Sequence, residues 1–185
     1  PFGEENDLSI KLLNKLNLDI KYNTFKRKCK EHEFVNLIRD CDFLIAGTDK
    51  ISSKIIDLSP KLKLIARVGI GLDGIDLKYA KKKGIKITYT PDAPAQAVAE
   101  LTLANIFNLL RNIHISNLEL RQQSWDRYYG LNLEDTTIGI IGAGRIGSIV
   151  INKLFALGVK FLKVNDLNKN IKLEKKFKNK LKWVS

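Results

Sequence analysis

Cysteine and histidine are scarce in this sequence of 185 residues, which contains two of each. Cys29 and Cys41 are too few for a disulfide framework, and no paired spacing of cysteine and histidine marks a zinc site. We therefore expect no structural metal and a reduced, cytoplasmic protein.

Aromatic residues and unbroken apolar runs are also few. Aromatics make up 8% of the chain, which leaves no evident stacking platform for nucleic acid. The most apolar stretch, residues 97–115, is interrupted by polar side chains such as Glu100 and Arg111, so it predicts a buried helix rather than a membrane span. The acidic start at residues 1–7 lacks the apolar segment of a secretory signal.

Positive charge is what the composition has in excess. The formal net charge is +12 and the pI is about 9.7, as in many proteins that bind nucleic acid. The lysines are dispersed among apolar positions, however, and even the densest basic stretch, Lys169–Lys182, carries apolar anchors such as Leu173 and Phe177. We interpret the excess as solvated surface charge and expect neither a nucleic-acid nor a membrane partner.

The hydrophobic pattern alternates between short apolar runs and amphipathic segments. Strands are expected at residues 18–22, 42–46, 62–68, 85–89, 136–141 and 159–164. Helices are expected at residues 8–16, 33–39, 53–58, 77–83, 95–120 and 146–157, with N-caps at Ser52 and Asp76 and a terminating glycine at Gly84. This alternation predicts an α/β fold whose parallel sheets are covered on both faces.

Two closely spaced prolines, Pro91 and Pro94, divide the chain. They disfavour helix until after Pro94. The long helix expected from Ala95 to about Leu120 is apolar nearly all round in its first half, which predicts that it is buried. We therefore expect two domains, residues 1–93 and 94–185.

A glycine-rich turn, Gly142-Ala143-Gly144-Arg145-Ile146-Gly147, joins the strand at 136–141 to the helix that follows. In such a turn the first glycine permits the tight bend, the second lets a pyrophosphate approach the backbone, and the third lets helix and strand pack closely. The helix dipole and the N–H groups at the helix start attract the phosphates, and Arg145 adds charge beside them. The spacing predicts a dinucleotide site.

An acidic residue, Asp166, lies at the position where a dinucleotide site needs a carboxylate. Asp166 comes just after the strand at 159–164, 19 residues beyond Gly147. A carboxylate at this point accepts hydrogen bonds from the ribose hydroxyls and repels a 2′-phosphate. Asp166 therefore favours NAD over NADP.

Three ordered segments resemble the D-isomer-specific 2-hydroxyacid dehydrogenases. Residues 62–76 are similar to a signature loop of that family, residues 90–102 to its hinge and interdomain helix, and residues 136–147 to its nucleotide turn. The family includes enzymes of 3-phosphoglycerate, glycerate, glyoxylate or hydroxypyruvate, and D-lactate. The phosphoglycerate dehydrogenase branch, which serves serine biosynthesis, is the most similar.

The resemblance implies a flavodoxin-like substrate domain, here without its first strand, followed by an interdomain helix and the first half of a Rossmann-type NAD domain. It also implies hydride transfer between C2 of a small 2-hydroxy or 2-oxo acid and the nicotinamide, and a homodimer. By resemblance the site residues are Val68 and Gly69 on the substrate carboxylate through their amides, Thr48 on the substrate side, Ile70 beside the cofactor, Thr102 near its nicotinamide end, Arg145 and Ile146 over the pyrophosphate, and Asp166 on the ribose.

The family's catalytic arginine, glutamate and histidine have no counterpart in this sequence. The resemblance places all three downstream of the nucleotide turn, and neither His32 nor His114 matches a family position. We therefore expect a fragment truncated at both ends and inactive by itself. Gly74 is a departure, because the family usually has asparagine after this aspartate, and the departure affects the side-chain hydrogen bonds of the loop.

Two other functions share parts of the pattern. An NAD-sensing binding protein, related to transcriptional corepressors of this fold, would use the same domains for partner recognition, and the basic charge agrees with that reading. A short-chain reductase would need a Tyr-x-x-x-Lys pair. Tyr79 and Lys83 have this spacing but precede the nucleotide turn, so a reductase of that type is not expected.

Overall fold

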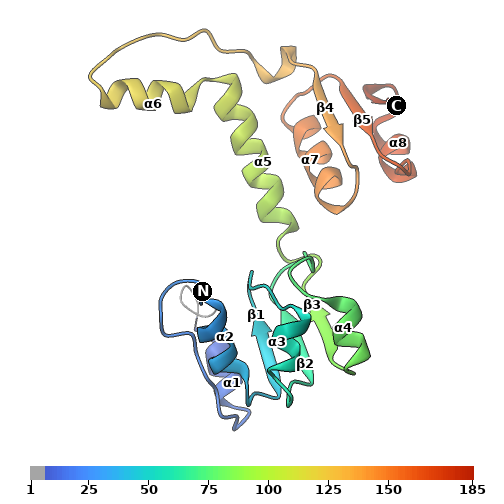
Figure 1. Cartoon of the computed structure of the whole chain (residues 1–185). Coiled ribbons are helices and arrows are strands. Elements are labelled where there is room, and N and C mark those ends of the chain that lie inside the picture. Colours follow the sequence, from blue (N-terminus) through green and yellow to red (C-terminus); the bar gives the residue numbers. More distant parts are fainter. Residues whose placement is uncertain (1–6) are drawn as a thin grey trace. The chain divides into compact units, whose positions relative to one another are not determined.

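The computed structural model describes residues 7–185. The chain divides into two compact units, residues 1–91 and 92–185. Each unit contains a three-stranded sheet whose strands are all parallel (Figure 1). The α/β fold class expected from the alternating pattern is confirmed.

The first unit builds its sheet in chain order, β1-β2-β3. Its elements are α1 (Leu8–Asn14), α2 (Glu31–Ile38), β1 (Phe43–Ala46), α3 (Ser53–Asp57), β2 (Leu64–Arg67), α4 (Leu77–Lys82) and β3 (Lys86–Tyr89). Arg67 at the end of β2 stands beside Tyr89 at the end of β3. This register brings the segments that follow the two strands to the same edge of the sheet.

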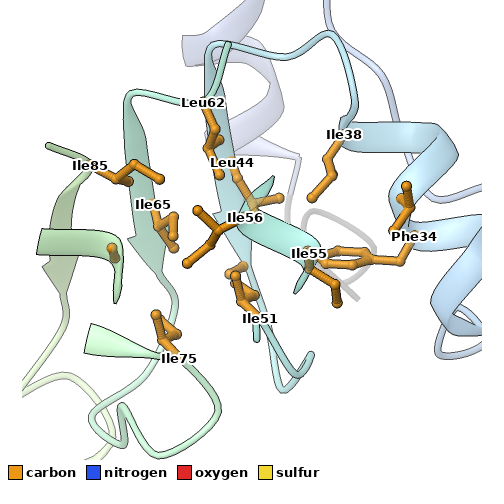
Figure 2. Packing of buried hydrophobic residues seen from close by; sticks show 13 residues of the cluster. Phe34, Ile38, Leu44, Ile51, Ile55, Ile56, Leu62, Ile65, Ile75 and Ile85 are labelled. Atoms are coloured by element: carbon orange, nitrogen blue, oxygen red, sulfur yellow. The ribbon is translucent and has the colours of Figure 1, made fainter. Parts of the chain in front are cut away.

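Isoleucine dominates the core of this unit. Ile51 and Ile65 are completely buried, and Ile55 and Ile56 nearly so. Figure 2 shows side chains from α2, α3, β1 and β2 converging between the helices and the sheet. Complete burial of one such side chain stabilises the fold by about 1.5–3 kcal/mol, so this cluster holds β2 and the loop after it in place.

Both ends of α4 carry the predicted caps. The Asp76 carboxylate accepts a hydrogen bond from the Tyr79 amide at 3.0 Å, and Gly84 ends the helix with φ +73°. Ser52 occupies the N-cap position of α3, but its side chain accepts no hydrogen bond from that helix.

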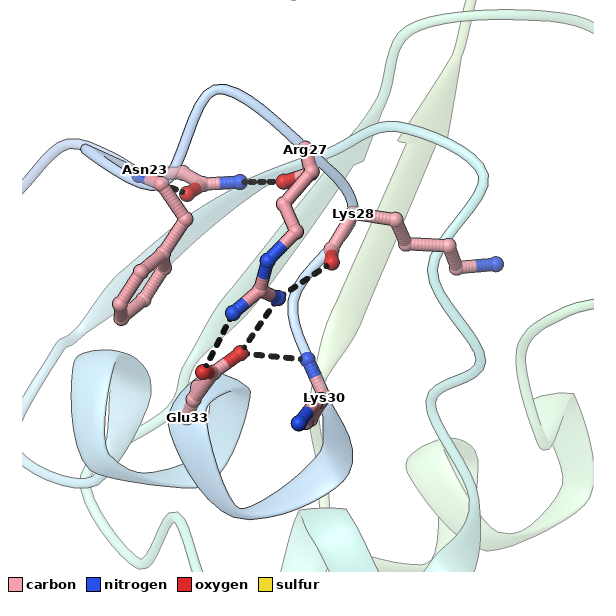
Figure 3. Close-up of polar contacts among 6 residues, drawn as sticks. Asn23, Arg27, Lys28, Lys30 and Glu33 are labelled. Atoms are coloured by element: carbon pink, nitrogen blue, oxygen red, sulfur yellow. Dashed lines mark hydrogen bonds and ion pairs between the residues drawn. The ribbon is translucent and has the colours of Figure 1, made fainter.

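An ion pair fixes the start of α2 (Figure 3). The Arg27 guanidinium donates to both oxygens of Glu33, at 2.7 and 2.8 Å, and the Lys30 amide donates to the same carboxylate at 2.8 Å. Because Arg27 and then the Lys30 amide favour the charged form, the pKa of Glu33 falls to about 2.

The second unit has the sheet order β4-β5-β6. Its elements are α5 (Ala95–Leu110), α6 (Ile113–Arg121), η1 (Leu133–Asp135), β4 (Ile138–Ile141), α7 (Arg145–Ala156), β5 (Leu162–Asn165), α8 (Ile171–Phe177), η2 (Lys178–Lys180) and β6 (Leu181–Trp183). In its core Ile151 and Leu154 of α7 meet Leu162 and Val164 of β5, and Ala99 of α5 joins the same cluster. This packing anchors α7 against the sheet.

The predicted strand at residues 18–22 is wrong. These residues form no strand, and Leu18 and Tyr22 are 46% and 42% exposed. Alternation of apolar and polar residues makes a strand only where another strand supplies hydrogen bonds. Within the part of the chain that the structure describes, no strand pairs with this segment.

The single long helix expected from Ala95 to Leu120 is also wrong, because the chain forms two helices. Asn112 adopts a left-handed conformation, φ +52° and ψ +33°, between α5 and α6, and asparagine tolerates this better than most residues. Within the second unit the helix is buried on one side only: Ala95 and Ala99 are buried, whereas Leu101 and Leu109 are 63% and 77% exposed.

The basic stretch Lys169–Lys182 carries apolar anchors, as its sequence indicated. It folds as α8, η2 and the strand β6, which pairs with β5. Leu173 and Leu181 are buried in it, and the Phe177 ring stacks on Phe155 of α7 with 4.1 Å between centroids. Among the helices of residues 7–185, none has the length and apolarity that a membrane crossing requires.

Candidate functional site

The glycine-rich turn after β4 needs its first and third glycines for steric reasons. Gly142 has φ +94°, a conformation that side chains disfavour. A Cβ on Gly147 would lie 1.9 Å from the Gly142 carbonyl oxygen, a severe overlap. Helix α7 can therefore approach the turn this closely only because position 147 has no side chain.

The second glycine of the turn faces open space. No atom lies within 4 Å of the place where a Cβ on Gly144 would stand. Gly144 is the N-cap of α7, and the first N–H groups of a helix have no acceptor within the helix. The turn thus leaves room and hydrogen-bond donors at the positive end of α7.

Two polar side chains that the sequence did not single out brace this turn. The Ser148 hydroxyl donates to the Ala143 carbonyl at 2.8 Å, and the Asn170 amide lies 3.3 Å from both that carbonyl oxygen and the Ser148 Oγ. Asn170 also caps α8 by accepting from the Lys172 and Leu173 amides. Its position before an amphipathic segment was the one sequence signal for it.

Asp166 follows β5 and contacts the turn directly. Its Oδ2 accepts a hydrogen bond from the Ala143 amide at 2.6 Å, and its Oδ1 accepts from the Asn168 amide at 3.1 Å. These backbone donors, with Asn168 the largest influence, hold the pKa of Asp166 below its usual value. The side chain is partly exposed, so a charged carboxylate lies beside the turn and within reach of a ligand.

A hollow of about 550 Å³ lies against the turn. Its lining is mainly apolar and consists of Thr102, Ile106, Ile138, Gly139, Ile140, Ile141, Gly142, Gly144, Ile146, Gly147 and Val150. Thr102 and Ile146, both predicted to contact a cofactor, are thus brought together with the glycines. The Thr102 hydroxyl donates to the Val98 carbonyl at 2.8 Å. Arg145 instead forms an exposed ion pair with Asp92, 2.9 Å apart.

The loop after β2 gives the predicted Val68 and Gly69 amides internal partners. The Val68 amide donates to the Ala46 carbonyl at 2.9 Å, and the Gly69 amide donates to the Thr90 hydroxyl at 2.8 Å. By contrast, the amides of residues 70–74 have no acceptor within residues 7–185. In this structure the loop's backbone amides without an internal acceptor therefore begin at Ile70.

The close approach of a neighbouring segment accounts for glycine, in place of the expected asparagine, at position 74. A Cβ at this position would lie 2.9 Å from the Asp49 carbonyl oxygen. The Gly74 carbonyl accepts from the Ile51 amide at 2.7 Å, so the two segments are held together. The close backbone approach leaves no room for a side chain unless one segment moves.

The remaining candidates lie on the surface. Thr48 is exposed, and its carbonyl accepts from the Lys28 ammonium at 2.9 Å. His32 and His114 are exposed as well. No group of three or more potential metal ligands occurs in the described part of the chain.

A parallel sheet with a glycine turn at a helix start and an acid after the next strand defines a Rossmann-type α/β protein. The family described as D-isomer specific 2-hydroxyacid dehydrogenase, catalytic domain, matches residues 4–182. The chain belongs to this family.

Curated relatives with two different names are similar to the chain. It is 38% identical over 136 residues to a D-3-phosphoglycerate dehydrogenase of Methanocaldococcus jannaschii. This alignment covers 71% of the chain and 26% of the relative. It is 35% identical over 154 residues to a hydroxypyruvate reductase of Thermotoga maritima, with 82% of the chain and 49% of the relative covered. The chain thus spans at most about half the length of these relatives.

Solved structures agree on the fold. The D-lactate dehydrogenase from Aquifex aeolicus, complexed with NAD and lactic acid, superimposes with a TM-score of 0.78 at 29% identity, covering 98% of the chain and 54% of that structure. The TT0316 protein from Thermus thermophilus superimposes with a TM-score of 0.83 at 24% identity, covering 96% and 56%.

Proposed function

We propose that this chain supplies the cofactor turn and part of the substrate domain of an NAD-dependent oxidoreductase of D-2-hydroxy acids. The observation that carries the proposal is the turn at Gly142–Gly147. Gly147 lets α7 pack closely against the turn, and Gly144 faces open space. The Asp166 carboxylate accepts a hydrogen bond from the backbone of the turn. The open second glycine and the carboxylate beside the turn suit a dinucleotide.

The residues present fit the cofactor. Position 144, where a side chain would obstruct a pyrophosphate, is open, and the adjoining hollow contains Thr102 and Ile146. Gly142, Gly144, Ile146 and Gly147 would hold the pyrophosphate, Asp166 the adenosine ribose, and Thr102 the nicotinamide side. When bound, NAD supplies a hydride acceptor for the C2 hydrogen of the substrate.

Arg145 would have to leave Asp92 to cover the pyrophosphate. Their ion pair is exposed on both sides, 59% and 79%. Exposed pairs of this kind contribute roughly 0–1 kcal/mol. A pyrophosphate, which carries more negative charge than one carboxylate, would therefore compete effectively for this guanidinium.

We assign the substrate to the first unit, within the predicted residues 1–93, and the interdomain helix and NAD site to residues 94–185. We propose that the substrate carboxylate binds backbone amides at the end of β2, those of Val68 and Gly69. Both amides have internal acceptors in this structure, the Ala46 carbonyl and the Thr90 hydroxyl, so the carboxylate would replace these acceptors on binding. By resemblance to the family we also assign Ile70 to the cofactor and Thr48 to the substrate.

The substrate we propose is 3-phosphoglycerate or a close analogue. A relative 38% identical to the chain is named D-3-phosphoglycerate dehydrogenase, whereas one 35% identical is named hydroxypyruvate reductase. Both substrates are short 2-hydroxy or 2-oxo acids, and the name of the first relative would place the reaction in serine biosynthesis. Two free cysteines, Cys29 and Cys41, agree with a reducing compartment such as the cytoplasm.

We also propose a homodimer formed through the second unit. Apolar side chains are exposed on α6 and on the segment after it, including Ile113, Leu118, Leu120, Trp125 and Leu131. Several exposed apolar side chains along one helix and the segment after it are typical of an interface between subunits. Light scattering would give twice the chain mass if this surface pairs, and a monomer at all concentrations would contradict the proposal.

The test of the proposed function is a titration of the 185-residue chain with NADH and with NADPH, followed by nicotinamide fluorescence. We expect NADH to bind more tightly, because Asp166 accepts from the ribose hydroxyls and repels a 2′-phosphate. In Asp166→Ala the preference should shrink to about twofold or less. Equal affinities for both nucleotides in the unmodified chain, or no binding of either, would contradict the proposal.

A further inference from the structure

A second hollow, of about 480 Å³, lies in the second unit away from the glycine turn. Its lining includes Asn152, Phe155, Lys160, Lys176, Phe177 and Lys180. These residues belong to α7, the segment before β5, α8 and η2. Among the described residues, no acidic side chain lines this hollow. Its volume is in the range of small-molecule sites.

The hollow and the nucleotide turn lie at opposite ends of α7. The turn adjoins the start of this helix at Arg145, whereas Phe155 and Ala156 at its end line the hollow. A helix of 12 residues is about 18 Å long. The strand β5 separates the two places in the same way, because Asp166 follows it and Lys160 precedes it. A dinucleotide held by the turn would therefore leave the hollow free.

Lys176 is held in place by neutral groups. Its ammonium donates to Oδ1 of Asn152 at 2.5 Å, and the amide nitrogen of Asn152 donates to the Ser148 carbonyl at 2.6 Å. The same ammonium lies 5.2 Å from the centre of the Phe177 ring, which is a cation–π distance. None of these contacts neutralises the positive charge. The hollow is therefore lined by a cation whose position is fixed and whose charge is uncompensated.

The other two lysines of the hollow also have little compensating charge. Lys180 forms no ion pair in the part of the chain that the structure describes. Lys160 approaches Glu134 and Asp135 only to 3.6 and 3.9 Å, and exposed pairs of this kind are weak. The surrounding segment, residues 169–182, contains seven lysines and one glutamate. Cations gathered in a concave surface create a positive potential that attracts anions.

Two stacked phenylalanines form the apolar part of the hollow. The rings of Phe155 and Phe177 have centroids 4.1 Å apart and planes inclined by 27°. Both side chains pack against the core of the second unit, yet both are only partly buried. Aromatic surface beside lysines suits a ligand that has an aromatic body and an anionic group.

A residue in an unusual conformation shapes the wall of the hollow. Lys178 has φ +45° and ψ −123°, which is disfavoured for any residue with a side chain. It lies between α8 and η2, so Lys176 before it and Lys180 after it both line the hollow. Such conformations persist only where the surrounding structure holds them, and they are frequent at ligand sites.

We propose that this hollow is a binding site for a small organic phosphate, a phosphate ester with an aromatic body. Lys160, Lys176 and Lys180 would bind the phosphate oxygens, since lysine ammonium groups bind phosphate as point charges. The rings of Phe155 and Phe177 would contact the aromatic body. The site is separate from the nucleotide turn, so this assignment stands whether or not the turn binds NAD.

The experiment titrates the ¹⁵N-labelled 185-residue chain with phenyl phosphate and, separately, with inorganic phosphate. We expect phenyl phosphate to shift the amide signals of Val159, Lys160 and Phe177. It should bind about fivefold more tightly than inorganic phosphate, because only the ester reaches the two rings. The Gly144 amide reports on binding at the nucleotide turn instead. Shifts confined to that turn, no shift at all, or equal affinities for the two probes would overturn the proposal.

Lys180→Gln and Lys175→Gln form a matched pair, since each removes one positive charge. Lys175 belongs to α8 but does not line the hollow. Phenyl phosphate should weaken about fivefold in Lys180→Gln and stay within about twofold in Lys175→Gln. Thermal melting of both variants should match that of the unmodified chain, because neither lysine has an ion-pair partner to lose within the described residues.

Equal weakening in the two variants would show diffuse attraction to the basic segment and would overturn the site. A short oligothymidylate tests the other class of phosphate ligand. We expect it to bind more weakly than phenyl phosphate at physiological salt. Tighter binding, with amide shifts spread over residues 169–182, would indicate a nucleic-acid surface and contradict the small-molecule assignment.

Discussion

The two units each contain a glycine-rich loop after a parallel strand, and the loops are shaped in opposite ways. The loop at 142–147 owes its form to missing side chains, since a Cβ on Gly147 would overlap the Gly142 carbonyl. The loop at 68–74 owes its form to side chains that are present, Arg67 and Thr90, which hold its carbonyl groups. Both leave backbone amides free.

The difference explains why one loop is easy to recognise and the other is not. Glycines with fixed spacing are a local feature, because sterics between neighbouring residues dictate them. The hydrogen bonds between Gly69 and Thr90 form only once β2 and β3 pair in register. Such a contact spans 21 residues and leaves no local pattern.

The largest effect is expected from filling the closest contact. Gly147→Ala should abolish NADH binding, because the added Cβ would lie 1.9 Å from the Gly142 carbonyl oxygen and force α7 away from the turn. Overpacking of this kind also costs about 1–3 kcal/mol of stability. Fluorescence titration and thermal melting measure the two losses. Unimpaired NADH binding would show that the turn does not hold the cofactor.

Gly144→Ala sharpens the same comparison. No atom lies within 4 Å of the added methyl group, so melting of the second unit should change little. NADH affinity should still fall, by about tenfold or more, since the methyl group would stand where the pyrophosphate approaches. A variant that melts normally and binds NADH normally would remove the second glycine from the proposed site.

A smaller effect is expected at the edge of the other loop. Gly74→Asn would restore the residue usual in the family, yet its Cβ would lie 2.9 Å from the Asp49 carbonyl oxygen. We expect a loss of about 1–2 kcal/mol in chemical denaturation of the first unit. Gly71→Ala is a useful comparison, because its nearest neighbour would be the Asp73 carboxylate at 3.7 Å. If Gly74→Asn is as stable as the unmodified chain, the segments around Asp49 and Gly74 have room for a side chain, which would contradict the close contact.

The smallest effect is a difference in response to acid. Asp166 has a lowered pKa, so its contribution to stability is complete above the unfolded value near 3.9 and is lost as the pH falls through the lower folded value. The Ala143 amide signal should therefore titrate below pH 4, and not in Asp166→Asn. The Gly69 amide, held by a neutral hydroxyl, should not follow this titration. An Ala143 inflection near pH 5 or above would contradict the lowered pKa.

Sequence reasoning found those features that depend on neighbours along the chain. The turn at Gly142–Gly147, the cap at Asp76 and the alternation of strands and helices are all local. It missed the break at Asn112, because a left-handed residue within an apolar helix pattern leaves no mark in the hydrophobic spacing.

The fine structure of the candidate site required the fold. The amides of Val68 and Gly69 are the predicted donors for a carboxylate, yet in the folded chain one donates to the Ala46 carbonyl and the other to the Thr90 hydroxyl. The contribution of Asn170 to the nucleotide turn likewise depends on α8 returning to the start of α7. Hydrogen bonds between distant segments decide which donors remain free, and these cannot be read from residue spacing.

The most direct test adds NADH and oxamate separately to the ¹⁵N-labelled chain and follows every assigned backbone amide. We expect NADH to shift the amides around Gly144 and Asp166, and oxamate, a small carboxylate that resembles a 2-oxo acid, to shift those of residues 68–71. Each ligand would thus report on a different glycine loop. NADH that leaves the amides of residues 142–147 unmoved while binding elsewhere would contradict the central claim that this turn is the cofactor site.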